Sequence, residues 1–283
     1  MTRRKGFTLI ELLVVIAIIA LLMSILMPAL ARVKKQAQSV ACMSRLRSWG
    51  LQYKLYTDDN NGYFPEGQGY SQHPQNKGGA EYGLWMNAMR PYYVDDEMRF
   101  CPTATRIVLG TGDWGTFKAW RTPDLMDNRY PASNEGPEIN WTGSYGTNNW
   151  IDYMLANRTN GNRSVDWFWK SAQNLKTPNQ VPILGDNTWH DSWPQQIDVP
   201  VATSWDFGWG DKGTAGEMNQ FCIDRHNGWT NLTFADWSVR HVGLKDLWTL
   251  RWHRQYDVNG PWTKAGRVNP SDWPQWLRKY KDY

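Results

Sequence analysis

The sequence lacks the patterns that mark most enzymes and nucleic-acid-binding proteins. It contains no H-E-x-x-H, no paired C-x-x-C, no twelve-residue calcium loop, no G-x-S-x-G and no glycine-rich phosphate loop after a predicted strand. Basic residues exceed acidic residues by only four (31 against 27). Three of them, Arg3, Arg4 and Lys5, precede the first apolar run, which leaves a formal charge of +1 for residues 7–283 (28 against 27). These absences argue against an enzyme and leave no strongly basic domain for a nucleic acid.

Aliphatic residues are concentrated near the N terminus, whereas all 19 tryptophans lie from Trp49 onward. A domain poor in leucine and isoleucine has to build its core from other side chains, and each aromatic ring buries a large apolar area. We therefore predict a loop-rich domain with a largely aromatic core. The alternative is an exposed aromatic patch that binds a sugar or another surface, and its best candidates stand in the proline-containing C-terminal tail: Trp262, Trp273 and Trp276.

The N-terminal region is long and apolar enough to cross a membrane. Leu12 to Ala31 contains 20 residues without a charge, which as a helix would span about 30 Å, the thickness of a bilayer core. An ordinary secretory signal peptide is the alternative, because basic residues precede this run and Ala29-Leu30-Ala31 resembles a cleavage site. However, the run exceeds the usual ~7–15 residues, and a charged Glu11 would cost about 2.5–3.5 kcal/mol at a membrane centre. We therefore predict a retained helix in which Glu11 has a purpose.

Residues 5–12, Lys-Gly-Phe-Thr-Leu-Ile-Glu-Leu, resemble the class III signal of type IV pilins and of the pseudopilins of type II secretion. The resemblance implies that a prepilin peptidase cuts after Gly6 and that the new N terminus, Phe7, is methylated. It also implies that Glu11 neutralises the Phe7 amine of a neighbouring subunit, which removes two charges from lipid at once. Pro28 matches a proline that interrupts hydrogen bonding in many such helices and permits local melting in the filament.

The same resemblance implies a location and a set of partners. The chain would cross the inner membrane once, with its head in the periplasm, before it enters an extracytoplasmic filament. Its partners would be other pilin subunits, the prepilin peptidase and an inner-membrane assembly platform. The expected organisation is a leader at 1–6, a membrane and filament-core helix at 7–31, an amphipathic stem at 32–57 and a globular head with a C-terminal tail at 58–283. The signal does not distinguish a pilus from a secretion pseudopilus, or a major subunit from a minor one.

The N-terminal helix is predicted to continue beyond the membrane. A helix from Phe7 to about Thr57 would be roughly 75 Å long, too long to be buried in one small domain, so half of it should project. The polar run at 57–62 favours a turn and should end it. We predict an α+β fold in which this helix packs on a small antiparallel sheet with long tryptophan-rich loops. Apolar side chains in its second half recur at steps of 4, 3, 4 and 3 and share one helical face: Cys42, Leu46, Trp49, Tyr53 and Tyr56.

Short strand-like segments follow the helix. They include 181–185 and the pair 231–235 and 238–242, which together predict a hairpin about Asp236-Trp237. Residues 225–242 resemble an RH-x-x-x-x-N-x-x-F-A-D-G-H-V signature near the C terminus of a pilin-like family abundant in some environmental bacteria. Trp237 stands where that family usually has glycine. Because a left-handed turn position prefers glycine, either the loop has another geometry or Trp237 serves as a contact residue for a ligand.

Three cysteines agree with an exported domain. Cys42 on the stem and Cys101 are predicted to form a disulfide that pins the first loop region to the helix. Closing a loop of this size would contribute about 4 kcal/mol in the chain-entropy model. Cys222 is then left over, most simply as a buried thiol, although the sequence does not exclude that it replaces either partner.

The candidate metal ligands are Asp186, His226 and Asp236. The simplest interpretation is a polar network of these residues with Arg225 that fixes the hairpin loops; a calcium ion is the alternative, and a catalytic zinc site is the least favoured. The expected function is therefore a structural filament subunit that needs no cofactor. Its rivals are a membrane-anchored or minor-pilin module that binds polysaccharide and a membrane-tethered metal hydrolase that depends on His226 or Asp236.

Overall fold

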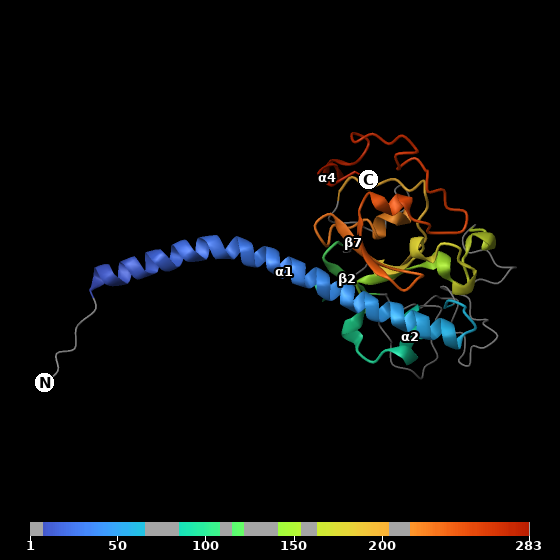
Figure 1. Ribbon diagram of the computed structural model, residues 1–283, viewed down its shortest axis with the longest axis horizontal. Coiled ribbons are helices and arrows are strands. Elements are labelled where there is room, and N and C mark those ends of the chain that lie inside the picture. Colours follow the sequence, from blue (N-terminus) through green and yellow to red (C-terminus); the bar gives the residue numbers. More distant parts are fainter. Residues whose placement is uncertain are drawn as a thin grey trace.

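The structure is a computed structural model that describes residues 8–65, 85–107, 115–121, 141–153, 163–203 and 216–282. Its first element is a helix, α1 (Leu9–Asp59), which projects far from the head at its N-terminal end and lies against the head at its C-terminal end (Figure 1). Asn60 ends the helix, and Asn61 and Gly62 follow with φ angles of 55° and 82°. These left-handed positions favour Asn and Gly. The predicted end of the helix is thus confirmed within two residues.

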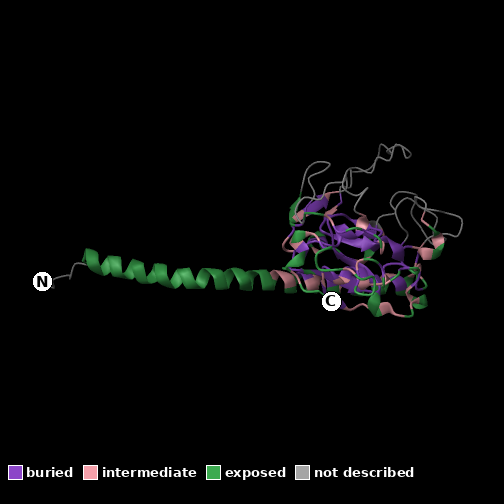
Figure 2. Ribbon diagram, turned by 90° about the horizontal axis from the view of Figure 1, so that it is seen from above, coloured by how far each residue is buried: buried purple, intermediate pink, exposed green. Residues whose placement is uncertain are grey.

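The first half of α1 has no packing partner among the residues that the structure describes. Every residue from 8 to 37 is exposed, and Figure 2 shows this part of the helix as one exposed rod. It is long and apolar enough to cross a membrane, with a mean hydropathy of 3.0 over its most apolar stretch. Contact with the head begins at Gln38, whose Nε2 donates to the carbonyl oxygen of Pro102 at 3.3 Å. The helix therefore meets the head from residue 38 onward, and the boundary between a membrane part and a stem at 31 stays a prediction.

The second half of α1 buries a single stripe, as its periodicity predicts. Tyr56 is only half-buried, and Thr57 takes its place at the end of the stripe. The hydroxyl of Thr57 donates to the carbonyl oxygen of Lys54, so its hydrogen bond is satisfied within the helix when the side chain is buried. The buried residues are Cys42, Leu46, Trp49, Gly50, Tyr53 and Thr57.

The stem lies against a five-stranded sheet with the order β6-β4-β5-β7-β8. Its strands are β4 (Tyr145–Asn148), β5 (Pro182–Asp186), β6 (Asp191–Ser192), β7 (Trp229–Phe234) and β8 (Val239–Gly243). The pairs β4–β5, β5–β7 and β7–β8 are antiparallel, whereas β6 joins β4 in parallel at the edge. A smaller sheet has the order β1-β2-β3 and contains β1 (Arg106–Ile107), β2 (Lys118–Arg121) and β3 (Thr142–Gly143). The α+β class is confirmed, with two mixed sheets in place of one antiparallel sheet.

The two faces of the larger sheet bury different parts of the chain. Side chains alternate along β7: the hydroxyl of Thr233 donates to the carbonyl oxygen of Leu46 on α1, whereas Leu232 and Phe234 belong to a second core on the other face. The first core contains α1 and α2 (Trp85–Met89), and the second contains the C-terminal segment with α4 (Gln275–Arg278). Both are largely aromatic, which confirms the predicted use of tryptophan. The buried tryptophans are Trp49, Trp85, Trp120, Trp141, Trp150, Trp189, Trp193, Trp248, Trp252 and Trp273.

The C-terminal tail packs back on the domain, and this burial removes Trp273 from the predicted binding patch. Trp273 is 1% exposed and lies edge to face with Trp248 at 5.6 Å between ring centroids. Trp262 and Trp276 are half-buried, and Nε1 of Trp276 donates to the carbonyl oxygen of Val201. The prediction of three surface tryptophans is wrong for Trp273, because the tail covers the second core and needs this ring there.

The predicted hairpin is present as β7 and β8, with Thr233 opposite Val239. Its turn places Trp237 at φ = 67°, the left-handed position that would suit glycine. Trp237 is half-buried against the first core. Its backbone lies close to Gly50, where a Cβ would be 3.2 Å from the carbonyl oxygen of Trp237. The tryptophan thus keeps the turn geometry of a glycine and uses its ring for packing against the stem.

Candidate functional site

Two parts of the molecule carry residues singled out by the sequence: the start of α1 and a buried polar cluster in the head, where the stem meets the larger sheet. At the start of α1, Thr8 and Glu11 form a capping box. The backbone N–H and the hydroxyl of Thr8 both donate to Oε2 of Glu11 at 2.8 Å, and the N–H of Glu11 donates back to Oγ1 of Thr8 at 3.3 Å. This arrangement satisfies amides that a helix N terminus otherwise leaves unpaired. Glu11 therefore has a local role in its own helix, which the sequence interpretation missed although the T-x-x-E pattern was its signal.

The described residues of this chain leave the segment that follows Glu11 uncovered. Its apolar side chains point in all directions around the helix axis, with Leu9 77% and Leu30 69% exposed. Pro28 lies within the helix and brings no N–H to the hydrogen-bond ladder. Gly6 and Phe7, the predicted cleavage and methylation residues, lie outside the described residues.

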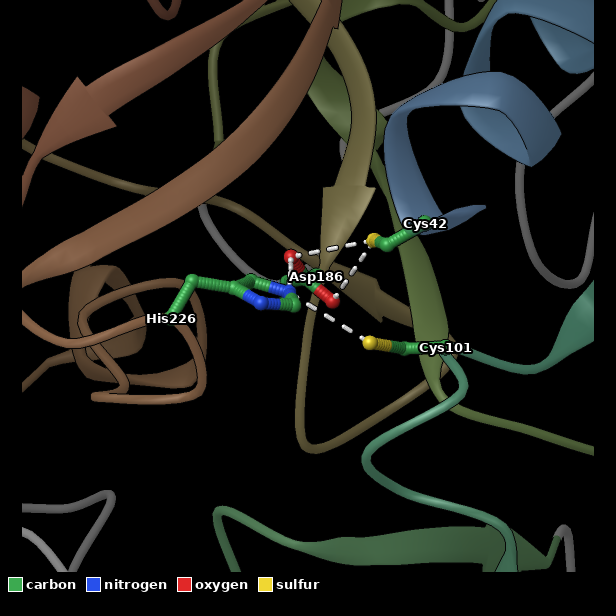
Figure 3. Close-up of side chains that lie close together, drawn as sticks. All are labelled: Cys42, Cys101, Asp186 and His226. Atoms are coloured by element: carbon green, nitrogen blue, oxygen red, sulfur yellow. Dashed lines mark hydrogen bonds and ion pairs between the residues drawn. The ribbon is translucent and has the colours of Figure 1, made fainter. Parts of the chain in front are cut away.

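The buried cluster joins four side chains from distant parts of the chain (Figure 3). Cys42 comes from the stem, Cys101 from the segment before β1, Asp186 from the end of β5 and His226 from the loop before β7. Sγ of Cys42 lies 3.6 Å from both carboxylate oxygens of Asp186. Nε2 of His226 lies 3.1 Å from Oδ2 of Asp186 and 3.4 Å from Sγ of Cys101. The four donor atoms are all within 4.8 Å of one another.

Hydrogen bonds from surrounding residues hold these side chains in place. Nη1 of Arg225 lies 3.3 Å from Oδ1 of Asp186, and the backbone N–H of Asn231 donates to Oδ2 at 3.1 Å. The hydroxyl of Tyr145 donates to Sγ of Cys42 at 3.3 Å, and Oγ1 of Thr103 lies 3.0 Å from Sγ of Cys101. The donor groups of Asp186, Cys42 and Cys101 are thus each oriented by a neighbour outside the cluster, as in sites whose geometry matters.

The four groups also determine one another's ionisation. Burial alone would raise the pKa of Asp186, but the charges of His226 and Arg225 outweigh it and hold the pKa well below its usual range. Burial likewise lowers the pKa of His226, and the nearby Asp186 carboxylate more than offsets this and raises it to about 10. Burial raises the pKa of Cys101, yet hydrogen bonds with Cys42 and His226 bring it down to about 6. Cys42 differs, because burial raises the pKa of its thiol.

The cluster corrects two of the predictions made from sequence. Cys42 and Cys101 do meet in space, but the predicted disulfide is not formed: both are free thiols, as is Cys222 in the second core. Asp236 is not part of the cluster. It is exposed in the hairpin turn, where its Oδ1 accepts hydrogen bonds from the N–H and the hydroxyl of Ser238. Proximity in sequence suggested Asp236, whereas the β7–β8 turn directs it away from His226.

The fourth polar residue predicted for this region, Arg225, does lie beside Asp186. The predicted polar network is therefore present for three of its members, with the two cysteines in place of Asp236. Calcium does not suit this set of donors, because it prefers six to eight oxygen ligands. The described residues hold no other group of three or more donors at metal-binding distance.

Comparison with known proteins gives two similarities. Residues 1–27 match the family described as "Prokaryotic N-terminal methylation motif". The chain is also similar to the type IV wide pilus major component PilA4 of Thermus thermophilus, with 44% identity over 63 residues, which are 22% of this chain and 48% of PilA4. The chain thus spans about half the length of this curated relative. No solved structure matches the chain. These similarities confirm the resemblance to type IV pilins inferred from residues 5–12.

Proposed function

We propose that this protein is a structural subunit of a type IV pilus-like or type II secretion pseudopilus filament and that its work is mechanical rather than catalytic. The observation that carries the proposal is the projecting half of α1. It is exposed over residues 8–37 and uncharged and largely apolar on all sides over 12–31, and most of it lies within the methylation motif matched at 1–27. A helix of this kind is stable in lipid before assembly and in a bundle of equivalent helices afterwards. The similarity to a pilus component supports the same conclusion.

In this proposal the precursor crosses the inner membrane once with its head in the periplasm. A prepilin peptidase cuts after Gly6, and the methylated Phe7 becomes the first residue. An assembly platform in the inner membrane then transfers the subunit into an extracytoplasmic filament of pilin subunits. N-terminal sequencing of the mature protein tests the processing step: a methyl-Phe7 start supports it, whereas a start at Arg32 indicates ordinary secretion.

Glu11 has two roles in this scheme. Before assembly its carboxylate is satisfied by Thr8, which is why the helix tolerates it. During assembly the carboxylate pairs with the Phe7 amine of a neighbour, so that neither charge stays alone in an apolar environment. Pro28 contributes a local weak point, because the carbonyl of Ser24 receives no N–H from it.

Two substitutions separate the charge of Glu11 from its cap. Glu11→Gln keeps an oxygen that accepts hydrogen bonds from Thr8, since Gln serves in capping boxes, but it removes the charge. We expect this variant to be processed normally and to remain in the membrane. Filaments should be missing from the material that is sheared off the cell surface. The matched control, Thr8→Val, removes the hydroxyl at a cost of about 1 kcal/mol to the helix end and keeps the charge. We expect it to assemble. Normal assembly of Glu11→Gln would limit Glu11 to its capping role.

A further inference from the structure

We propose that Cys42, Cys101, Asp186 and His226 bind a single zinc ion that fastens α1 to the sheet. Thiolate sulfur, imidazole nitrogen and carboxylate oxygen are the three kinds of ligand that zinc takes in proteins, and four protein ligands make a closed, structural site. This inference does not depend on the filament, because it concerns the fold of the head.

Three of the six distances between donor atoms lie close to those of tetrahedral coordination, and all six are within 4.8 Å. Zinc bonds of about 2.3 Å to sulfur and 2.0–2.2 Å to nitrogen and oxygen place the ligand atoms of a tetrahedron roughly 3.3–3.8 Å apart. In the structure the His226–Asp186, Cys101–His226 and Cys42–Asp186 pairs are separated by 3.1, 3.4 and 3.6 Å. Figure 3 shows all four side chains directed toward one point, although they come from four different segments. Small side-chain movements would therefore complete the coordination.

Burial and charge also suit a bound cation. Cys42, Cys101 and Asp186 are 0% exposed and His226 is 9% exposed. Two thiolates and one carboxylate around a divalent ion leave one net negative charge, and the Arg225 guanidinium beside Asp186 neutralises it. Zinc would displace the protons that the thiols and the imidazole carry, as metal binding to such ligands generally does.

The surrounding hydrogen bonds have the form of an outer shell around a metal site. Tyr145 donates to the sulfur of Cys42, and Asn231 donates its backbone N–H to Asp186. Donors of this kind orient ligands and tune their affinity. The sulfur ligands favour zinc over calcium or magnesium, which prefer oxygen.

The zinc content of the purified full-length protein in detergent tests the proposal. We expect one equivalent of zinc per chain by elemental analysis and a thiolate-to-metal charge-transfer band when Co²⁺ replaces it. Loss of a residue that only orients a ligand weakens metal binding by about 10- to 100-fold. Cys101→Ser removes a ligand itself, so it should weaken Zn²⁺ binding by more than about 100-fold. Tyr145→Phe keeps all four ligands and should weaken it by about 10-fold. Cys222→Ser is the matched control and should bind zinc like the wild type, because Cys222 lies in the second core beside Leu244.

Three results would overturn the zinc site. The first is a disulfide between Cys42 and Cys101 in unreduced peptides from protein isolated on the exported side. The second is wild-type protein with free thiols that binds neither added Zn²⁺ nor Co²⁺. The third is equal loss of metal from Cys222→Ser and Cys101→Ser. The cobalt spectrum of the wild type decides the question even where a ligand variant fails to fold.

Discussion

The two halves of α1 belong to one continuous helix, yet they meet opposite surroundings. Residues 9–37 are exposed (Figure 2), and from 12 to 31 they carry no charge and are mostly aliphatic on every side, whereas the stem carries one narrow stripe of larger side chains that the head covers. A helix that is apolar all round needs a partner on all sides, and a helix with one apolar stripe needs a partner on one side. The difference teaches which contacts are built into the chain: the head supplies them for the stem, and under the proposed function lipid or other subunits would supply them for the projecting half.

The largest expected effect comes from removing the main anchor of the stem. Trp49 is 0% exposed, lies edge to face with Trp85 and Tyr93, and donates from Nε1 to the carbonyl oxygen of Met98 at 2.7 Å. We expect Trp49→Ala to lower the free energy of unfolding of the head by about 3–5 kcal/mol, the usual cost of truncating a buried aromatic residue. Urea unfolding of the full chain in detergent, followed by tryptophan fluorescence, measures it.

The projecting half provides the control for that experiment. Leu21 is 63% exposed, so Leu21→Ala should change the free energy of unfolding of the head by less than about 0.5 kcal/mol. Similar losses for Leu21→Ala and Trp49→Ala would break the comparison, because they would mean that the head also depends on the projecting half.

The second expected effect is a dependence of stability on pH, which should arise in the head and not in the projecting half. Residues 8–31 of the projecting half contain one ionisable group, Glu11. The head buries His253 at 1% exposure with its ring stacked on Trp167, and neither ring nitrogen has a hydrogen-bond partner among the described residues. Burial lowers the pKa of His253 from 6.5 to about 4. Because the folded pKa is depressed, the stabilisation is complete above pH 6.5 and is lost as pH falls through 4. The shift corresponds to about 3 kcal/mol.

His253→Phe should remove this acid sensitivity, because phenylalanine keeps the ring in the stack and has no group to protonate. We expect the variant to lose less stability than the wild type between pH 6.5 and 4, by about 3 kcal/mol at the acid end. Equilibrium unfolding at several pH values measures the difference. His241→Gln, at an exposed position on β8, should change the slope less. If the free energy of unfolding of His253→Phe depends on pH as steeply as that of the wild type, other groups are responsible for the acid sensitivity.

The sequence predicted those parts of the fold that are determined by residues close to one another in the chain. The helix, its end at 57–62 and the β7–β8 hairpin each follow from side-chain periodicity and turn chemistry within a short segment. The buried cluster does not, because it depends on strand order: β5 lies between β4 and β7, which brings Asp186 beside His226. Trp273 was misassigned for the same reason, since prolines around it predict loops but do not show which core the loops cover.

The smallest expected effect tests how closely the stem and the hairpin fit. Gly50 is buried within α1, and a Cβ there would lie 3.0 Å from Cγ2 of Thr233 and 3.2 Å from the carbonyl oxygen of Trp237. Alanine favours the helix by about 1 kcal/mol over glycine, whereas overpacking costs about 1–3 kcal/mol. The Trp237 oxygen belongs to the backbone of a strained turn and yields less than a side chain would, so the clash should prevail.

We therefore expect Gly50→Ala to destabilise the head by about 1 kcal/mol in the same urea experiment. Leu51 is the next residue in the helix and is 57% exposed, so Leu51→Ala should change the free energy of unfolding by less than about 0.5 kcal/mol. A gain in stability for Gly50→Ala would mean that helix propensity outweighs contact at this point. The hairpin would then lie farther from the stem than in the structure, whereas the boundary between the two halves of α1, set by the contact of Gln38 with Pro102, would stay where it is.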